Sequence, residues 1–272
     1  MNFIYIVTMI EFSNHFLCWI YKGKNMEEKL NIAYTQKPEW DNGIGSKKLK
    51  KFLQNFCEEF ASYSLRYHKA LGEFPFVYSE RSLTSIVLPS LINNKSTNKE
   101  TFVFMEHPFK KKKGIQRFLD FYIDYGDSLY LLEMKHQWNA YKTTSLNKKT
   151  FKVWKDCQKQ IQDINNQSIN DHMCDLSFYK HAFKIALMIM PVYDTLKDKN
   201  TLKNITYLTH HEYYTNIEEA FKANKEETVT QPNFLAVWKI DKNKKYQQEL
   251  ADSQFSFYPY IVFAFYIEKI EF

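Results

Sequence analysis

Glycine, proline and cysteine are all scarce in this sequence. Its 272 residues include only 6 glycines, 7 prolines and 4 cysteines. Cys18, Cys57, Cys157 and Cys174 form no CxxC pair and have no histidine at zinc-site spacing, so we expect reduced, mostly buried thiols in a cytoplasmic protein. The sequence also lacks a phosphate-binding glycine loop, a serine-hydrolase elbow and an HExxH motif. The sequence therefore does not predict a P-loop nucleotide-binding protein, an α/β-hydrolase or a zinc protease of the HExxH type.

An uninterrupted apolar run of membrane-spanning length is missing as well. The apolar start of the chain, through Tyr21, is broken by Glu11, Asn14 and His15, which is untypical of a spanning helix. No basic residue precedes this run and no small-residue cleavage site follows it, so a signal peptide is not predicted. We expect no membrane partner. Residues 1–25 are interpreted either as a buried start of the fold or as the product of an upstream start codon, because Met26 opens a more ordinary amphipathic sequence.

Aromatic residues, in contrast, are abundant at 17%, and the formal net charge is +6. The length suits one large α/β domain or a core with a modest addition. A mild positive charge permits an anionic partner such as nucleic acid but does not require one.

Hydrophobic spacing predicts alternating helices and strands, which is typical of a mixed α/β fold. The hairpin rests on the Gly126-Asp127 turn signal, and Gly72 and Pro191 are expected to stop the elements before them. The predicted elements are a helix over 46–71 capped by Ser46, a helix from Glu80 capped by Ser79 that ends or kinks at Pro89, a strand over 101–105, hairpin strands over 116–125 and 128–136, a helix over 147–164, a buried strand over 183–190, a helix over 212–223, and strands over 234–240 and 260–267.

Charged residues stand on otherwise apolar strands in the segment RFLDFYIDYGDSLYLLEMKHQW, residues 117–138. Asp120 lies on the first strand of the predicted hairpin, and Glu133 and Lys135 lie near the end of the second. Since side chains alternate along a strand, Glu133 and Lys135 point to one face while Met134 points to the other. An acid and a lysine at the end of an apolar strand indicate a site.

The chemistry that suits these residues is metal-assisted hydrolysis. Mg²⁺ prefers oxygen ligands and commonly takes one or two carboxylates together with waters and phosphate oxygens. Asp120 and Glu133 would supply carboxylates, and the backbone carbonyl near Met134 would add a ligand. The metal would polarise a phosphate and lower the pKa of a bound water. Lys135 would orient that water or neutralise developing charge.

The pattern of Asp120 followed by Glu133-Met134-Lys135 on a hairpin resembles the PD-(D/E)xK, restriction-endonuclease-like nucleases. The resemblance implies a mixed central sheet flanked by helices, Mg²⁺ or Mn²⁺ as cofactor, and catalytic and metal roles for Asp120, Glu133 and Lys135. Glu80 corresponds to the helical glutamate that many members add. Phe118-Leu119 stand before Asp120, where the proline that names the motif is absent. The match covers residues 46–191 and leaves 1–45 as an extension and 192–272 as extra C-terminal strands of the same domain or an accessory region.

A row of lysines on the next helix adds a candidate for phosphate binding. Lys148, Lys152, Lys155 and Lys159 follow steps of four, three and four, so they share one helical face, and Gln158 borders it. A solvated lysine face explains the same spacing. For the run of Lys110 to Lys113, a solvated turn is the simpler interpretation.

These observations predict an Mg²⁺-dependent DNA endonuclease, in bacterial defence or restriction, with DNA favoured over RNA. The alternative is a non-catalytic nucleic-acid-binding, effector or assembly protein that keeps the fold. A homodimer or a partner-protein complex is compatible with either.

Overall fold

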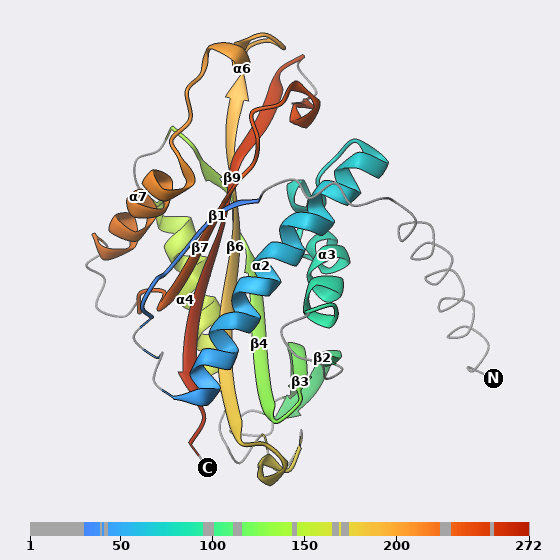
Figure 1. The fold of residues 1–272 in the computed structure, drawn as a ribbon, viewed down its shortest axis with the longest axis vertical. Helices are drawn as coiled ribbons and strands as arrows, with labels where there is room; N and C mark the ends of the chain where they lie inside the picture. The colour runs from blue at the N-terminus through green and yellow to red at the C-terminus, as the bar shows by residue number, and fades with distance from the viewer. Residues whose placement is uncertain are drawn as a thin grey trace, which may run out of the picture.

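The structure is a computed structural model that describes residues 30–38, 40, 43–94, 101–110, 116–142, 146–164, 169, 174–223, 230–250 and 253–271. The apolar start, Cys18 and Met26 lie outside this part of the chain, as do residues 111–113 of the lysine run, so the predictions made for them stay predictions. The described residues form a mixed α/β fold built on one sheet with helices on both faces (Figure 1).

Nine strands make up this sheet in the described part of the chain. β4 (Ser128–His136) and the short β5 (Asn139–Ala140) run parallel to β6 (His181–Leu196), and every other described pair is antiparallel. From one edge to the other the order is β1 (Asn31–Tyr34), β7 (Phe234–Lys239), β9 (Phe255–Lys269), β6, β4, β3 (Gln116–Tyr125) and β2 (Thr101–Lys110), with β8 (Gln248–Glu249) paired to β9.

Helices α2 (Ile44–Leu71) and α3 (Glu80–Ile92) cover one face of the sheet. The ring of Phe52 lies 4.9 Å from that of Tyr125, and Phe60 lies 5.0 Å from Phe263. Helices α4 (Lys148–Gln162) and α7 (His210–Lys222) cover the other face, where Tyr213 stacks on Tyr260. The remaining helical segments are α6 (Thr201–Asn204) and the 3-10 turns Pro75–Val77, Leu176–Phe178 and Lys244–Tyr246.

The two hairpin strands, β3 and β4, have the bounds that were predicted from the sequence. Phe121 pairs with Leu132 and Tyr125 pairs with Ser128, so Gly126-Asp127 forms a two-residue turn in which Gly126 has φ 71°. Continuing this register by one residue sets Asp120 across from Glu133, on the α4 side of the sheet. Met134 faces the α2 side and is buried.

Several predicted boundaries were wrong. Gly43, not Ser46, precedes α2, and Ser46 is buried inside the first turn. Helix α3 continues through Pro89 to Ile92, held by the burial of Val87 and Leu91. By contrast, α2 stops as predicted at Gly72, which adopts the left-handed conformation with φ 79°.

Strands extend further than the sequence indicated. β6 passes through Pro191, which lies between the pairing with β4, ending at Ile189, and the pairing with β5, starting at Val192. A missing N–H is tolerated where the neighbour changes in this way. β2 likewise continues past Met105 to Lys110, because an edge strand accommodates a proline.

Residues before and after the predicted core belong to the same sheet. β1 comes from the segment 1–45 and pairs with β7, while β7 and β9 come from the segment 192–272. Cys57, Cys157 and Cys174 are free thiols, and the first two are buried. No helix in the described ranges is both long and apolar enough to cross a bilayer.

Candidate active site

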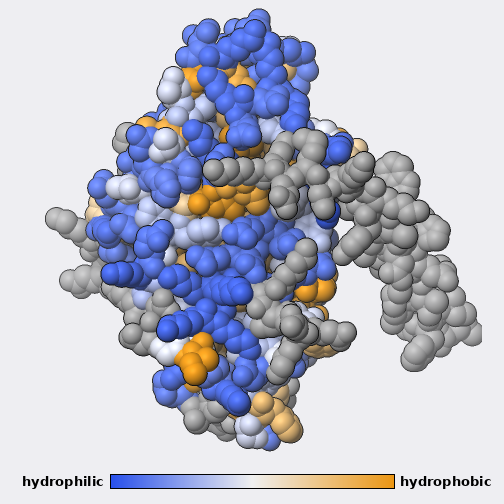
Figure 2. All heavy atoms as spheres, viewed as in Figure 1, coloured by the Kyte–Doolittle hydropathy of each residue, from blue (hydrophilic) through white to orange (hydrophobic). Residues whose placement is uncertain are grey.

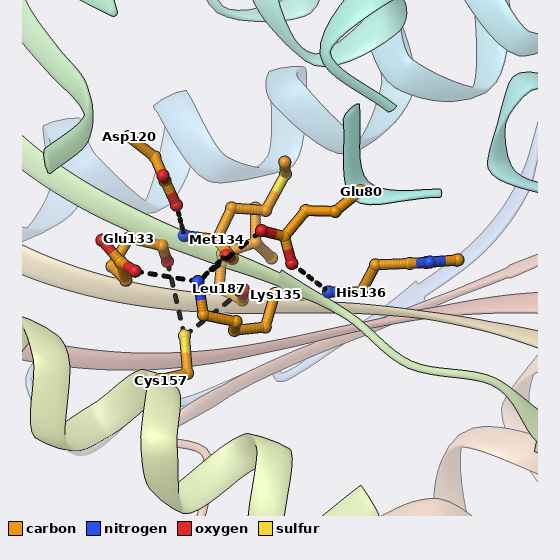
Figure 3. A network of polar contacts seen from close by, with 8 residues as sticks. All are labelled: Glu80, Asp120, Glu133, Met134, Lys135, His136, Cys157 and Leu187. Carbon is orange, nitrogen blue, oxygen red and sulfur yellow. Dashed lines mark hydrogen bonds and ion pairs between the residues drawn. The ribbon is translucent and has the colours of Figure 1, made fainter. Parts of the chain in front are cut away.

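Four predicted site residues meet where β4 ends (Figure 3). The Lys135 ammonium lies 2.9 Å from Glu133 Oε1 and 3.6 Å from Glu80 Oε1. Asp120 enters from β3 across the hairpin, and Glu80 enters from the first turn of α3. Residues from three elements, separated by up to 55 positions in the chain, therefore form one polar cluster at the end of an apolar strand.

Glu80 joins the start of α3 to the end of β4. Its Oε2 accepts a hydrogen bond from the His136 backbone N–H at 3.1 Å, while its Oε1 faces Lys135. Ser79 occupies the N-cap position as predicted, although its side chain makes no capping hydrogen bond. Glu80 therefore contacts β4 directly, in addition to the favourable interaction of a carboxylate with the helix dipole in the first turn of α3.

Asp120 is oriented by the backbone of the facing strand. Its Oδ2 accepts a hydrogen bond from the Met134 N–H at 2.7 Å. The Met134 carbonyl accepts from Lys135 Nζ at 2.9 Å. The carbonyl predicted to be a metal ligand therefore interacts with the lysine in this structure, and one carboxylate oxygen of Asp120 is engaged by an amide.

Burial and crowding make ionisation of Asp120 and Glu133 less favourable. Burial, and then the nearby charge of Asp120, raise the pKa of Glu133 from 4.5 to about 7, against the opposing effect of Lys135. Burial also raises the pKa of Asp120, although the Met134 amide opposes this. Burial alone would lower the pKa of Lys135, but Glu133, Asp120 and Glu80 outweigh it, so this pKa is raised and the lysine is charged at neutral pH.

His136 and Cys157 are the nearest titratable groups around the cluster. Burial lowers the pKa of His136 to about 4, so its imidazole is neutral, and its ring lies edge-on to Trp138 at 5.3 Å. Cys157 of α4 donates through Sγ to the carbonyl oxygens of Glu133 at 3.5 Å and Leu187 at 3.6 Å. Burial raises the pKa of this thiol, which makes it a packing contact beneath the site and a poor nucleophile.

The four lysines predicted to share a face are all exposed on α4. Gln158 does not lie in that exposed row. It is only 3% exposed and donates from Nε2 to the Thr230 carbonyl at 2.7 Å. The amide therefore ties α4 to the chain before β7, and the prediction of a nucleic-acid contact at Gln158 does not fit its position.

The cluster has the donor chemistry of a hard-cation site without being assembled as one. Among the residues that the structure describes, no three His, Cys, Asp or Glu side chains are arranged to hold a metal ion. Lys135 lies between Glu80 and Glu133 and neutralises part of their charge. The carboxylate oxygens are the ligand type that Mg²⁺ or Mn²⁺ prefers, and a bound cation would compete with the proton of Glu133 and lower the pKa of that carboxyl.

Glu106 on β2 lies beside the cluster and was not predicted from the sequence. The register between β2 and β3 sets Glu106 opposite Asp120, and its charge contributes to the raised pKa of Asp120. Glu106 also has φ 53°, which is unusual for a non-glycine residue within a strand. Its signal was hidden because the predicted strand ended one residue earlier, at Met105.

Comparisons with protein-family models, curated proteins and solved structures found no match to this chain.

Proposed function

We propose that this protein is a metal-dependent nuclease that hydrolyses DNA phosphodiester bonds on a restriction-endonuclease-like core. The observation that carries the proposal is the convergence of Glu80, Asp120, Glu133 and Lys135 at the end of β4. The hairpin, the preceding helix and the following parallel strand β6 support the likeness to the PD-(D/E)xK fold. A role in bacterial defence or restriction is part of the same proposal.

Each residue has a chemical role in this proposal. Asp120 and Glu133, with support from Glu80, would hold Mg²⁺ or Mn²⁺. When bound, the cation supplies charge neutralisation for the phosphate and a more acidic water. Lys135, charged and half-buried among the carboxylates, orients a water or stabilises the negative charge that develops on the phosphate oxygens. Asp120 is preoriented by the Met134 amide, and Glu80 fixes the end of β4 through the His136 amide.

The decisive experiment compares two lysines. Side-chain exposure is 21% for Lys135 and 20% for Lys48, which pairs with Asp127 at the other end of the hairpin. Lys135→Ala should abolish Mg²⁺-dependent cleavage of single- or double-stranded DNA, while Lys48→Ala should retain it. Glu133→Ala should behave as Lys135→Ala does, and Glu80→Ala should give a milder loss. Thermal melting of each variant separates loss of chemistry from loss of folding.

Two outcomes would contradict the catalytic proposal. One is cleavage that persists in Lys135→Ala, and the other is cleavage that persists in EDTA. DNA binding without cleavage by the wild type, under Mg²⁺ or Mn²⁺, would favour the alternative of a non-catalytic nucleic-acid-binding protein. The contact of Lys135 with the Met134 carbonyl is the observation that favours this alternative.

A further inference from the structure

Three phenylalanines are exposed together on the β2–β3 edge of the sheet. Phe102 is 59% exposed, Phe104 is 44% exposed and Phe118 is 58% exposed. The face that α2 presents in Figure 2 is mostly hydrophilic, with its hydrophobic side chains in small separate areas. Exposed aromatic side chains that gather on neighbouring strands form a contact surface, whereas single exposed hydrophobic residues are ordinary.

These phenylalanines share the face of the sheet that carries Asp120. Phe118, Asp120 and Tyr122 alternate along β3, so all three point the same way and are spaced by about 7 Å. Phe104 pairs with Tyr122 and Phe102 pairs with Asp124, and cross-strand partners point to the same side. The exposed rings therefore flank the candidate active site on both sides of Asp120.

The described helices pack mainly over other parts of the sheet. Helix α4 packs mainly on β4 and β6, and α3 packs against β2 on the opposite face, where Val103 and Met105 meet the core. Beneath the exposed rings, Tyr122 is fixed by a hydrogen bond of 2.7 Å between its hydroxyl and that of Tyr179. Phe102, Phe104, Phe118, His107 and Tyr122 thus form an aromatic surface on the face that α4 also covers, which we call the aromatic shelf.

The backbone of β2 disfavours the pairing of another strand with its edge, so a partner is expected to contact the face of the shelf. Glu106 has φ 53°, which breaks the alternation and lets the His107 ring stack on Tyr122 at 5.4 Å. Pro108 lacks an N–H. A residue with positive φ and a proline both disfavour pairing of another strand with an edge. A second copy of the chain is thus a poor fit for strand addition here.

We propose that Phe102, Phe104 and Phe118 of this shelf, supported by His107 and Tyr122, stack the bases of single-stranded DNA and place the phosphate between the bases beside Asp120. Bases that are already unstacked can lie on aromatic rings, and each such contact stabilises binding without regard to sequence. The exposed lysines of α4, which covers the same face of the sheet, supply positive charge for the backbone. The inference rests on the proposed nuclease function and narrows its substrate to single strands.

Binding in EDTA tests the shelf separately from cleavage. Fluorescence anisotropy would follow a labelled oligothymidine, its duplex with oligoadenosine, and an oligouridine. Phe104→Ala and Phe118→Ala should each weaken single-strand binding by at least about fivefold, from the energy of one base–aromatic stack. Phe118→Leu should weaken it similarly, because leucine keeps apolar surface but has no ring, and Phe118→Trp should retain it. Leu71→Ala, which removes a 53% exposed residue of α2, is the matched control and should bind normally.

Each other result overturns the inference in a recognisable way. Equal binding by Phe118→Ala and wild type, or tighter binding of the duplex, contradicts a base-stacking shelf. Binding of oligouridine but not oligothymidine contradicts the choice of DNA. A wild-type dimer that Phe104→Ala or Phe118→Ala converts to a monomer, measured by light scattering, shows a self-association surface instead. If the shelf variants bind normally while Lys135→Ala loses cleavage, the shelf is wrong and the proposed function stands.

Discussion

Replacing Glu133 by glutamine should stabilise the metal-free protein at about pH 8 and change its stability little at about pH 5. In the folded protein the pKa of Glu133 rises from 4.5 to about 7, because the carboxyl is buried beside Asp120. The folded state thus holds this proton more tightly than the unfolded chain. The associated stabilisation is complete below pH 4.5 and is lost as the pH rises through about 7.

The size of the effect follows from the pKa shift. Each pKa unit corresponds to about 1.4 kcal/mol, so the shift corresponds to roughly 3 kcal/mol at about pH 8. A glutamine amide resembles the protonated carboxyl and still accepts a hydrogen bond from Lys135. Glu133→Gln should therefore raise the melting temperature by about 6 °C at that pH, using about 2 °C per kcal/mol for a chain of this size.

Thermal melting across the pH range, with and without Mg²⁺, checks this prediction. Mg²⁺ should stabilise the wild type, because it favours the ionised carboxyls, and should stabilise Glu133→Gln much less. Glu268→Gln is the matched control, since Glu268 also pairs with a lysine, Lys184, at 2.8 Å but lies outside the cluster. It should leave the Mg²⁺ response unchanged. A Glu133→Gln variant that is destabilised equally at both pH values, or that responds to Mg²⁺ as the wild type does, would contradict the predicted effect of the raised Glu133 pKa.

Two further predictions concern α4. Lys148→Ala combined with Lys152→Ala should weaken DNA binding and reduce the steepness of log K against log salt by about 1.4 to 1.8, because two fewer phosphates are neutralised. The exposed pair Lys197 and Lys203, replaced by alanine in the same way, is the control. An equal slope in both double variants would show that the α4 lysines are only a solvated surface. Asn147→Ala should lower the free energy of unfolding by about 1 kcal/mol, measured by urea titration, because Asn147 Oδ1 accepts a hydrogen bond from the Thr150 N–H at 2.9 Å as the N-cap of α4. An unchanged free energy of unfolding would show that water replaces this cap.

The hairpin was predictable because its determinants are local. Gly126-Asp127 requires a tight turn, and the residues on each side alternate or run apolar as strands do. Once the hairpin is known, the register alone sets Asp120 opposite Glu133. The proximity of Glu80 to Lys135 was a different matter, because it depends on how α3 packs against the end of β4, and the resemblance to a nuclease family suggested it where periodicity could not.

Features that depend on neighbours in space were not predictable. Pro191 was expected to end a strand, but a change of pairing partner tolerates its missing N–H. β2 continues past its predicted end at Met105 to Lys110, and the early end concealed Glu106. The burial of Gln158 was not predictable for the same reason. Helical spacing places Gln158 at the border of the lysine face, but its side chain donates to the carbonyl of Thr230, which lies 72 positions further along the chain.

The energetic cost of the cluster is itself an argument for function. Glu133 is 6% exposed and has its pKa raised despite contact with Lys135, so the cluster does not ionise with a net gain in stability. Buried charges of this kind are often replaced by apolar residues without loss of stability. Elsewhere on the same sheet, Lys184 is buried but its partner Glu268 keeps contact with solvent, with its side chain 37% exposed. Lys184 and Glu268 fit a structural ion pair, whereas Asp120 and Glu133 both have raised pKa values and would ionise more readily with a further positive charge nearby. A divalent cation beside Asp120 and Glu133 would supply that charge.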